Sequence, residues 1–204
     1  MKSKKIIGLT GSIATGKSTA AKIIRELGYK VIDADKVAHS LMLQGGANYK
    51  AVVEYFGRQI IKEDLEIDRA KLGEIVFSSK EKLEMLNILT HDNIFNEINV
   101  IIKEIDEEVV FVEIPLLIEL LIESKLNITL DQIWLVYIDP EQQIKRLMSR
   151  NGFTYEEAEK RINSQIDIRR KKMYSDYIIH NDKDLTHLKN QIIEGLERIN
   201  EDFS

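Results

Sequence analysis

The sequence predicts a three-layer α/β fold, in which helices cover both faces of a parallel sheet, with an inserted helical lobe and a helical lid. Three observations predict it. Apolar segments of strand length alternate with helical patterns at both ends of the chain. Residues 45–106 interrupt this alternation with helical patterns alone. A glycine-containing loop, Gly11–Ser18, separates the first strand from the first helix.

Composition bounds the class of protein. The chain has 204 residues, of which 44% are hydrophobic, enough for one sizeable core. It contains no cysteine, which excludes disulfides and thiolate metal sites. No apolar run is long enough to span a bilayer, and the first residues lack the apolar segment of a signal peptide. We therefore expect a cytoplasmic protein with no membrane partner.

Charge is unevenly distributed along the chain. The net charge of −5 argues against general nucleic-acid binding. Residues 145–172 nevertheless carry nine Lys and Arg against four Asp and Glu, a local charge of +5. This basic segment indicates either a local anionic ligand or a solvated helix face.

The loop Gly11–Ser18 fits the pattern G-x-x-x-x-G-K-[ST] of a phosphate-binding loop. Its context fits too, because Lys5–Thr10 has the length and apolarity of a strand. Apolar residues after the loop recur at helical spacing: Ala20, Ile23, Ile24 and Leu27. The alternative is a chance match in a loop that happens to contain glycine, and the strand and helix on either side argue against it.

The residue types of the loop predict its chemistry. Two glycines permit backbone angles that turn successive N–H groups around a phosphate, and the helix N-terminus adds its unpaired N–H groups. Lys17 is expected to reach the β- and γ-phosphates, Ser18 to bind Mg²⁺, and Thr19 to lie close to the α-phosphate. The expected nucleotide-binding residues are Gly11, Ser12, Ile13, Ala14, Thr15, Gly16, Lys17, Ser18 and Thr19.

Two carboxylates follow the second predicted strand, residues 29–32. Ligands of open parallel sheets bind beyond the carboxyl ends of the strands, so Asp33 and Asp35 are expected near the phosphates. We expect Asp33 to meet a substrate hydroxyl. For Asp35 we favour the cap of the following helix, with a functional role as the alternative.

The interrupting segment, residues 45–106, reads as several helices. Asp68 is a predicted cap, and Ser78 with Glu81 resembles a capping box that opens a long helical run. We expect that run to be interrupted around His91. A helical lobe beside a phosphate loop suggests a binding site for the phosphate acceptor, although packing alone explains the same pattern. His91 itself is either a substrate-side residue or a structural polar contact.

Two further buried strands are predicted later in the chain. Residues 109–112 are β-branched or aromatic and end in Glu113, a position suited to an acid that helps to hold Mg²⁺. Residues 133–138 are followed by Asp139 as a helix cap and Pro140 at the first helical position.

The next segments predict the lid. Arg146 and Arg150 lie four residues apart on one helix face, where guanidinium groups suit charge stabilisation during phosphoryl transfer. A capping box, Thr154 with Glu157, opens a helix that we expect to reach about Lys172. Together these helices predict a hairpin that closes over ATP and excludes water. A last strand, 177–181, and a helix with core residues Leu185, Leu188, Ile192, Leu196 and Ile199 follow.

These segments, in this order, resemble the dephospho-CoA kinase family over nearly the whole chain. The phosphate loop alone is shared by many kinases, whereas the Asp-Ala-Asp and Ile-Pro-Leu-Leu motifs are more particular. The residues that carry the resemblance are Gly8–Gly11 with the loop, Val31–Asp35, Asp68-Arg69, Leu72, Val76-Phe77, Ile114–Glu119, Arg146, Arg150, Gln165, Asp176–Ile179 and Asn181.

The resemblance implies ATP-dependent phosphorylation of the 3′-hydroxyl of dephospho-coenzyme A, the last step of coenzyme A synthesis, with ATP and Mg²⁺ as cofactors. It implies catalytic roles for Asp33, Lys17, Arg146 and Arg150, with Asp33 as general base or orienter of the hydroxyl. Asn181 joins the nucleotide-binding residues, and Ser18 and Glu113 are the candidate metal ligands. The expected substrate residues are Asp33, Asp35, His39, Arg69, His91, Pro115, Leu116 and Leu117.

We expect one domain, a monomer or weak homo-oligomer whose partner is the small-molecule substrate and not nucleic acid. Its expected parts are a core of residues 1–44, 107–144 and 173–204, an acceptor lobe of about 45–106 and a lid of about 145–172. The alternatives are another small-molecule or nucleoside monophosphate kinase with the same loop, and an ATP-driven switch. A switch has no need for a hydroxyl-directed carboxylate, so Asp33 argues against it.

Overall fold

The computed structural model describes residues 4–201. Residue contacts divide the chain into two compact units, residues 1–32 with 106–204 and residues 33–105. The outermost residues of the expected core, 1–3 and 202–204, lie outside the described part. Among the described helices, none combines the length and the apolarity that crossing a membrane requires.

A five-stranded sheet forms the centre of the first unit, in the order β2-β3-β1-β4-β5. The ladders that join β3 to β1, β1 to β4 and β4 to β5 are parallel. The strands match the segments expected from the sequence, and β3 is buried along its whole length. Their bounds are β1 Lys5–Gly11, β2 Lys30–Asp33, β3 Val109–Glu113, β4 Gln132–Tyr137 and β5 Tyr177–His180.

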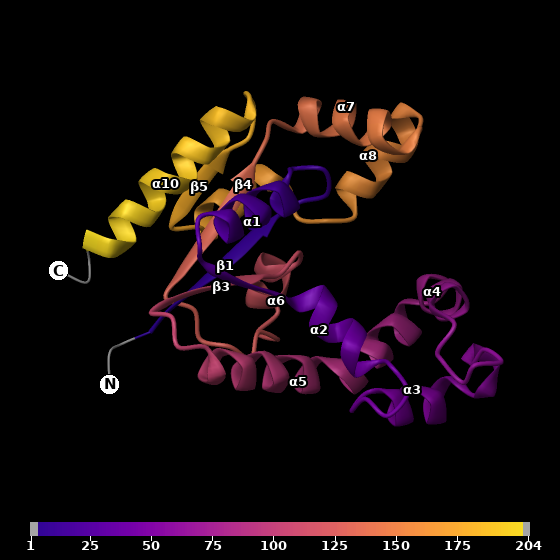
Figure 1. Ribbon diagram of the computed structural model, residues 1–204. Helices are drawn as coiled ribbons and strands as arrows, with labels where there is room; N and C mark the ends of the chain where they lie inside the picture. The colour runs from indigo at the N-terminus through magenta and orange to yellow at the C-terminus, as the bar shows by residue number, and fades with distance from the viewer. Residues whose placement is uncertain (1–3, 202–204) are drawn as a thin grey trace. The chain divides into compact units, whose positions relative to one another are not determined.

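Helices α1 (Lys17–Glu26) and α10 (Leu185–Glu201) cover one face of this sheet (Figure 1). They bury the side chains that alternate strand positions present on that face, including Ile7 and Leu9 of β1. Helix α10 packs closely because it presents Gly195 to the sheet. A Cβ there would lie 2.7 Å from the Trp134 ring.

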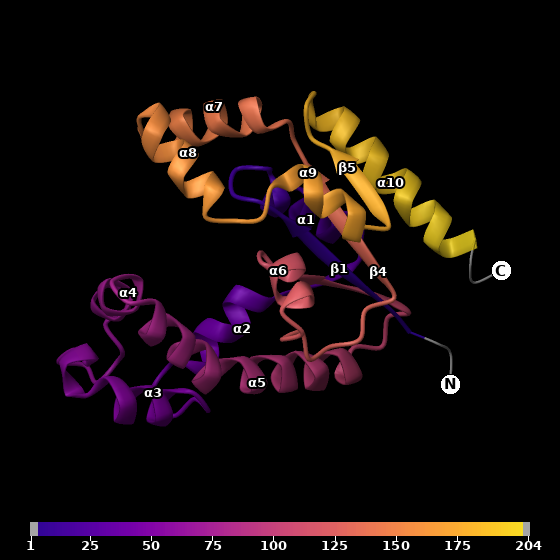
Figure 2. The ribbon, with the colours of Figure 1, turned by 180° about the vertical axis from the view of Figure 1, so that it is seen from behind.

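Helices α6 (Leu117–Ile122) and α9 (Ile168–Lys171) cover the opposite face (Figure 2). A Cβ on Gly8 of β1 would come within 2.7 Å of the Leu117 side chain, so α6 also approaches the sheet closely. Ile168 of α9 packs against Leu135 and Tyr137 of β4. Helices on both faces of a parallel sheet confirm the predicted three-layer fold class.

The segment expected to form the lid folds into the predicted helical hairpin, α7 (Pro140–Asn151) and α8 (Tyr155–Asn163). Both predicted caps are present, Asp139 on α7 and the Thr154 capping box on α8. The expected continuation of α8 to Lys172 is wrong. The Ser164 hydroxyl bonds back to the Arg161 carbonyl at the helix end, and the Asp167 side chain caps a separate helix, α9, which leads into the 3₁₀ turn η2 (Lys172–Tyr174).

The second unit is helical, as expected for the inserted segment. It contains α2 (Ala34–Leu41), α3 (Tyr49–Phe56), the 3₁₀ turn η1 (Arg58–Ile60), α4 (Arg69–Phe77) and α5 (Lys80–Glu104). Asn48 is fully buried, where its amide oxygen accepts a hydrogen bond from Asn93 and so joins the start of α3 to α5. The unit has its own core: Val52, Phe56, Ile60, Ile67, Leu72 and Val76.

Helix α5 corrects two predictions. It is continuous through His91, because its 25 residues contain no glycine or proline and each weak helix former costs only a few tenths of a kcal/mol. Its buried residues, such as Thr90 and Phe95, hold the middle of the helix in place. Its cap is Ser79 and not Ser78, because Ser78 still belongs to the end of α4 and bonds the Ile75 carbonyl.

Candidate active site

The phosphate loop runs from the end of β1 to the start of α1, as the sequence predicts. Gly16 is the N-cap of α1 with φ of 91°, a left-handed conformation that favours glycine. A Cβ at Gly16 would collide with the Asn181 amide. No side chain caps this helix end, so its first N–H groups and the positive end of its dipole are available to an anion.

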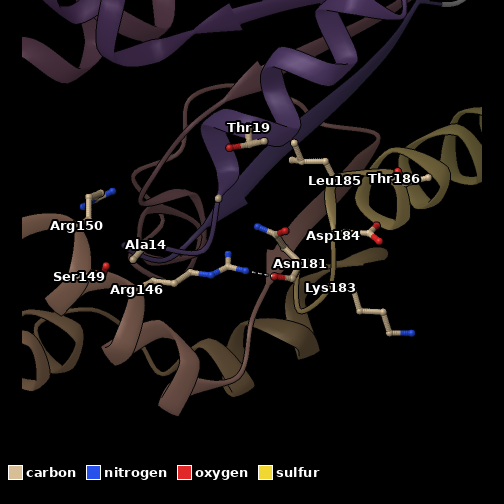
Figure 3. Close-up of a pocket in the computed structure, with 11 residues that line it drawn as sticks. Ala14, Thr19, Arg146, Ser149, Arg150, Asn181, Lys183, Asp184, Leu185 and Thr186 are labelled. Atoms are coloured by element: carbon tan, nitrogen blue, oxygen red, sulfur yellow. Dashed lines mark hydrogen bonds between the residues drawn. The ribbon is translucent and has the colours of Figure 1, made fainter.

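Asn181 holds the phosphate loop at Thr15. It follows β5, is 8% exposed, and donates from Nδ2 to the Thr15 carbonyl at 2.8 Å. Its own carbonyl accepts a hydrogen bond of 2.6 Å from the Arg146 guanidinium (Figure 3). An arginine of helix α7 is therefore joined through Asn181 to the phosphate loop.

These groups line one cavity of about 900 Å³, large enough for a nucleotide. The structure thus brings together the loop, both arginines and Asn181. Leu185 was expected in the core but is 65% exposed and lines this cavity, because it precedes the first buried turn of α10. The lining residues are Ala14, Gly16, Thr19, Arg146, Ser149, Arg150, Asn181, Lys183, Asp184, Leu185 and Thr186.

Lys17 is held by a buried carboxylate below the loop. Its Nζ lies 2.5 Å from Oε1 of Glu113, and Oε2 of Glu113 lies 3.4 Å from the Arg25 guanidinium. Glu113 is 4% exposed, and a carboxylate can be buried at this depth only when it is paired. Both of its oxygens therefore neutralise cations in this state.

The candidate metal ligands Ser18 and Glu113 differ in how available their side-chain oxygens are to a metal ion. Ser18 is exposed in the first turn of α1, where a hydroxyl oxygen suits Mg²⁺ alongside phosphate oxygens. Glu113 has its oxygens paired with Lys17 and Arg25, so it fits a direct metal contact less well. Within residues 4–201 no group of three His, Cys, Asp or Glu side chains is arranged to hold a metal ion.

In the helical unit, Asp33 corrects the expected cap. It is Asp33, and not Asp35, that caps α2, because the chain leaves its extended conformation at Asp33 and the helix begins at Ala34. One carboxylate oxygen accepts from the Lys36 N–H at 3.2 Å, and the side chain remains 23% exposed. Asp35 lies in the first turn of α2, where its charge suits the helix dipole.

His39 and Arg69 form a pair in the same unit. The Arg69 guanidinium lies 2.8 Å from Nδ1 of His39. Because arginine only donates, Nδ1 of His39 is the acceptor of this hydrogen bond. Asp68 caps α4 immediately before Arg69, as predicted, and the ring of His91 stacks edge-on against Phe95 one turn later.

The remaining predicted substrate residues follow β3. The Thr10 hydroxyl donates to the Pro115 carbonyl at 3.2 Å, which fixes this turn to β1. Leu116 is 44% exposed, whereas Leu117 is fully buried at the start of α6. Of these three side chains, Leu116 is the most accessible to a ligand.

Two groups near helix α9, Asp167 and Tyr137, have displaced pKa values. Hydrogen bonds from the Arg169 side chain hold the pKa of Asp167 below its usual value. Burial raises the pKa of Tyr137 on β4, and the nearby Asp139 carboxylate raises it further. Both groups keep their ordinary charge at neutral pH, so the start of α9 carries the Asp167 anion.

A family model described as dephospho-CoA kinase matches residues 5–187 of this sequence. The match covers both units and every residue of the site described above. The chain belongs to the dephospho-CoA kinase family.

Individual relatives agree over nearly their full length. A dephospho-CoA kinase from Carboxydothermus hydrogenoformans is 44% identical over 95% of this chain and 93% of its own. One from Streptococcus agalactiae is 45% identical over 96% of this chain and 99% of its own. The solved structure of dephospho-CoA kinase from Campylobacter jejuni is 30% identical, with a TM-score of 0.70, and covers 98% of this chain and 100% of that one.

Sequence reasoning missed several residues of this dephospho-CoA kinase family member. Ser149, Lys183, Asp184 and Thr186 line the cavity, and their only local signal is that they lie within five positions of Arg150 or Asn181. Two glutamines also contact the loop. Gln165 belonged to the resemblance without a role, and nothing in the sequence around Gln143 marks it.

Proposed function

We propose that this chain transfers the γ-phosphoryl group of ATP to the 3′-hydroxyl of the ribose of dephospho-coenzyme A. The observation that carries the proposal is one cavity lined by the phosphate loop, two arginines and Asn181, in a chain of the dephospho-CoA kinase family. Another small-molecule kinase with the same loop is not favoured, since the relatives that match nearly the full length are dephospho-CoA kinases.

Phosphate binding would be shared between backbone and side chains. The uncapped N-terminus of α1 supports a role for its N–H groups in holding the β-phosphate, with Lys17 reaching the β- and γ-phosphates. To do so, Lys17 must exchange Glu113 for phosphate oxygens. Mg²⁺ would neutralise charge between the β- and γ-phosphates, and the exposed Ser18 hydroxyl is the group best suited to hold it.

The lid would stabilise the negative charge that develops on the phosphoryl group in the transition state. Arg146 and Arg150 line the cavity from α7, and guanidinium groups match phosphoryl oxygens in geometry and charge. We propose that the lid, about residues 145–172, closes over ATP and excludes water, so that the alcohol is phosphorylated in preference to water.

Asp33 is proposed as the group that aims the acceptor. Its second carboxylate oxygen is not needed for the α2 cap and could accept the hydrogen bond of the 3′-hydroxyl. As the alcohol oxygen bonds to the γ-phosphorus and the bond to ADP breaks, the hydroxyl proton would pass to Asp33. ADP leaves with the electrons of the broken P–O bond.

The acceptor would be held by the helical lobe, about residues 45–106, and by residues near its ends. The Arg69–His39 pair offers a guanidinium of fixed orientation, suited to the diphosphate of dephospho-coenzyme A. Asp35, His91 and the Pro115–Leu117 turn are proposed to complete this site. The core would comprise residues 1–44, 107–144 and 173–204.

We further propose that the protein acts in the cytoplasm as a monomer or weak homo-oligomer without a nucleic-acid partner. Its net charge of −5 and lack of cysteine support this setting. Light scattering coupled to size exclusion tests the oligomeric state directly.

The decisive experiment is a coupled assay of ADP formation with Mg²⁺ and ATP over a panel of acceptors: dephospho-CoA, AMP, dTMP, shikimate and buffer alone. Turnover is expected with dephospho-CoA and not with the others. Mass spectrometry and phosphorus NMR of the product should locate the new phosphate at the ribose 3′ position. Turnover with a different acceptor, or none with dephospho-CoA, would refute the proposal.

A further inference from the structure

Two glutamine side chains hold the backbone of a single residue of the phosphate loop. The Ile13 N–H donates to Oε1 of Gln165 at 2.9 Å, and the Ile13 carbonyl accepts from Nε2 of Gln143 at 2.7 Å. Both polar groups of this peptide residue are therefore satisfied by side chains that lie 130 or more positions away in sequence.

The two glutamines lie at opposite ends of the lid hairpin. Gln143 is in the first turns of α7, where the chain enters the lid, and Gln165 follows the end of α8, where it leaves. Entry and exit are thus both fastened to Ile13. Because α7 carries Arg146 and Arg150, the position of these guanidinium groups relative to the loop depends on that attachment.

A second anchor holds the exit segment from its other side. The N–H of Ile166 donates to Oε1 of Glu119 on α6 at 3.2 Å. Glu119 also pairs with Lys171, whose Nζ lies 2.7 Å from one carboxylate oxygen and 3.0 Å from the other. Lys171 is fully buried. Consecutive residues, Gln165 and Ile166, are therefore fixed between the phosphate loop and α6.

The burial of Gln143 argues for a purpose beyond packing. Its side chain is fully buried, and an apolar residue of that size would fill the space without desolvating an amide. Within residues 4–201, its Oε1 is buried without a hydrogen-bond partner, and so is Oγ of Ser12, the residue before Ile13. Gln143 therefore buries an unsatisfied amide oxygen while its Nε2 donates a hydrogen bond to the Ile13 carbonyl.

The loop next to Ile13 needs support. Ala14 has φ of 62°, a left-handed conformation that is unfavourable for a residue with a Cβ, and it lines the cavity. Strained backbone of this kind persists only where surrounding contacts over-determine it. Hydrogen bonds to both polar groups of the preceding residue provide such contacts.

We propose that Gln143 and Gln165 are positioning residues that set the lid arginines in register with the phosphate loop. The inference rests on the proposed function of the hairpin as a lid over ATP. Loss of either hydrogen bond loosens the attachment of one end of the hairpin to the phosphate loop, so that phosphoryl transfer slows and water gains access to the γ-phosphate. The glutamines themselves contact the loop backbone and not the reacting atoms.

The two glutamines have opposite roles, and this makes the proposal sharply testable. Gln165 accepts a hydrogen bond, so Gln165→Glu keeps the contact and Gln165→Met removes it at similar volume. Gln143 donates, so both Gln143→Glu and Gln143→Met remove the contact, and the glutamate also sets a charge against a carbonyl. The neighbouring exposed Gln142, which makes neither contact, supplies the matched control Gln142→Met.

The experiment measures kcat, KM for ATP, and ADP formed per phosphorylated dephospho-CoA for all five variants and the unaltered chain. Gln165→Met and Gln143→Met should lower kcat by about tenfold each, the scale of one hydrogen bond, and raise the ratio of ADP to product. Gln165→Glu should transfer faster than Gln165→Met, and Gln142→Met should match the unaltered chain. Melting temperatures identify any variant that fails to fold.

A second readout does not depend on activity. Amide exchange followed by NMR without nucleotide should show Ile13 exchanging about tenfold faster in Gln165→Met and nearly unchanged in Gln165→Glu. Unaltered Ile13 exchange in Gln165→Met, or unaltered kcat and coupling in both methionine variants, would overturn the inference while leaving the proposed function intact. Failure of the unaltered chain to phosphorylate dephospho-CoA would instead refute the proposed function. Ile13 exchange would still decide whether Gln165 holds the phosphate loop as proposed.

Discussion

The two units of the molecule hold their functional groups in different ways. In the first unit, the phosphate loop is fixed by contacts from four other segments, through Asn181, Glu113, Gln143 and Gln165. In the helical unit, the candidate substrate-binding side chains also make contacts that stabilise the local structure. Asp33 caps α2 there, and Arg69 of α4 is paired with His39 of α2.

This difference indicates that the phosphate-binding loop must be more rigid than the site that binds the acceptor. A triphosphate is recognised largely by backbone N–H groups, which must be preorganised before it binds. An acceptor that combines apolar and charged parts suits side chains on helices that can adjust. In keeping with this, the helical unit exposes several large apolar side chains: Tyr55, Leu65, Phe77 and Ile88.

The largest effect is expected for Lys17→Ala. It should lower kcat/KM by about 10³-fold, because it removes a fixed positive charge from the developing phosphoryl charge. It also leaves Glu113 buried with Arg25 as its remaining cation, so the melting temperature should fall.

The double variant Lys17→Ala with Glu113→Gln separates these two effects. Its melting temperature should recover while its activity does not. Single-turnover rates that are unaffected by Lys17→Ala would show that the loop was wrongly assigned.

Arg146→Met should lower kcat by about 10²-fold, since this guanidinium both faces the cavity and bonds Asn181. Lys145→Met is the matched control, because it removes an exposed positive charge from the same helix beside Arg146. Rapid-quench measurements of both variants test the point. Equal phosphoryl-transfer rates in the two variants would show that Arg146 contributes only through net charge.

Arg69→Met should raise KM for dephospho-CoA by about tenfold with little change in KM for ATP, which would assign the two substrates to different units. Arg58→Met, an exposed arginine of η1, controls for charge on the helical unit. A parallel rise in KM for ATP would contradict this division.

The smallest effect is expected for Asp167→Asn at the base of the lid. Asparagine still caps α9 but loses the ion pair with Arg169. Because the pKa of Asp167 is lower in the folded state, the carboxylate stabilises the fold above its unfolded pKa, and this contribution disappears as the pH falls through the folded pKa.

The variant should therefore lose about 0.5 kcal/mol or less at pH 7, the scale of an exposed ion pair. It should lose nothing well below the folded pKa. Urea unfolding at several pH values measures the difference. A loss that persisted unchanged into acid would assign the effect to the cap and not to the charge.

The sequence predicted features whose cause is local. The phosphate loop, the Asp139, Thr154 and Asp68 caps and the strand segments each depend on a few neighbouring residues. Local reasoning was wrong where two neighbours competed for one role, as Asp33 with Asp35 and Ser79 with Ser78. In both cases, the residue at which the chain becomes helical determines which side chain is the cap, and residue type alone does not reveal that position.

Other features depend on contacts between distant segments. Helix α5 continues past His91 because its buried face is packed, and Leu185 lines a cavity because α10 begins at its edge. The Ile13 contacts join residues 130 and 152 positions apart. Nothing in the sequence near Gln143 signals its partner.

The most direct test concerns the carboxylate that is proposed to aim the acceptor. Asn caps a helix as well as Asp, so Asp33→Asn removes the base and keeps the α2 cap. Asp68→Asn makes the same change at the matching cap of α4. Phosphoryl transfer to dephospho-CoA in a single turnover should fall by about 10²-fold or more in Asp33→Asn, with unchanged ATP binding and little effect in Asp68→Asn. Equal single-turnover rates for the two variants would contradict the account.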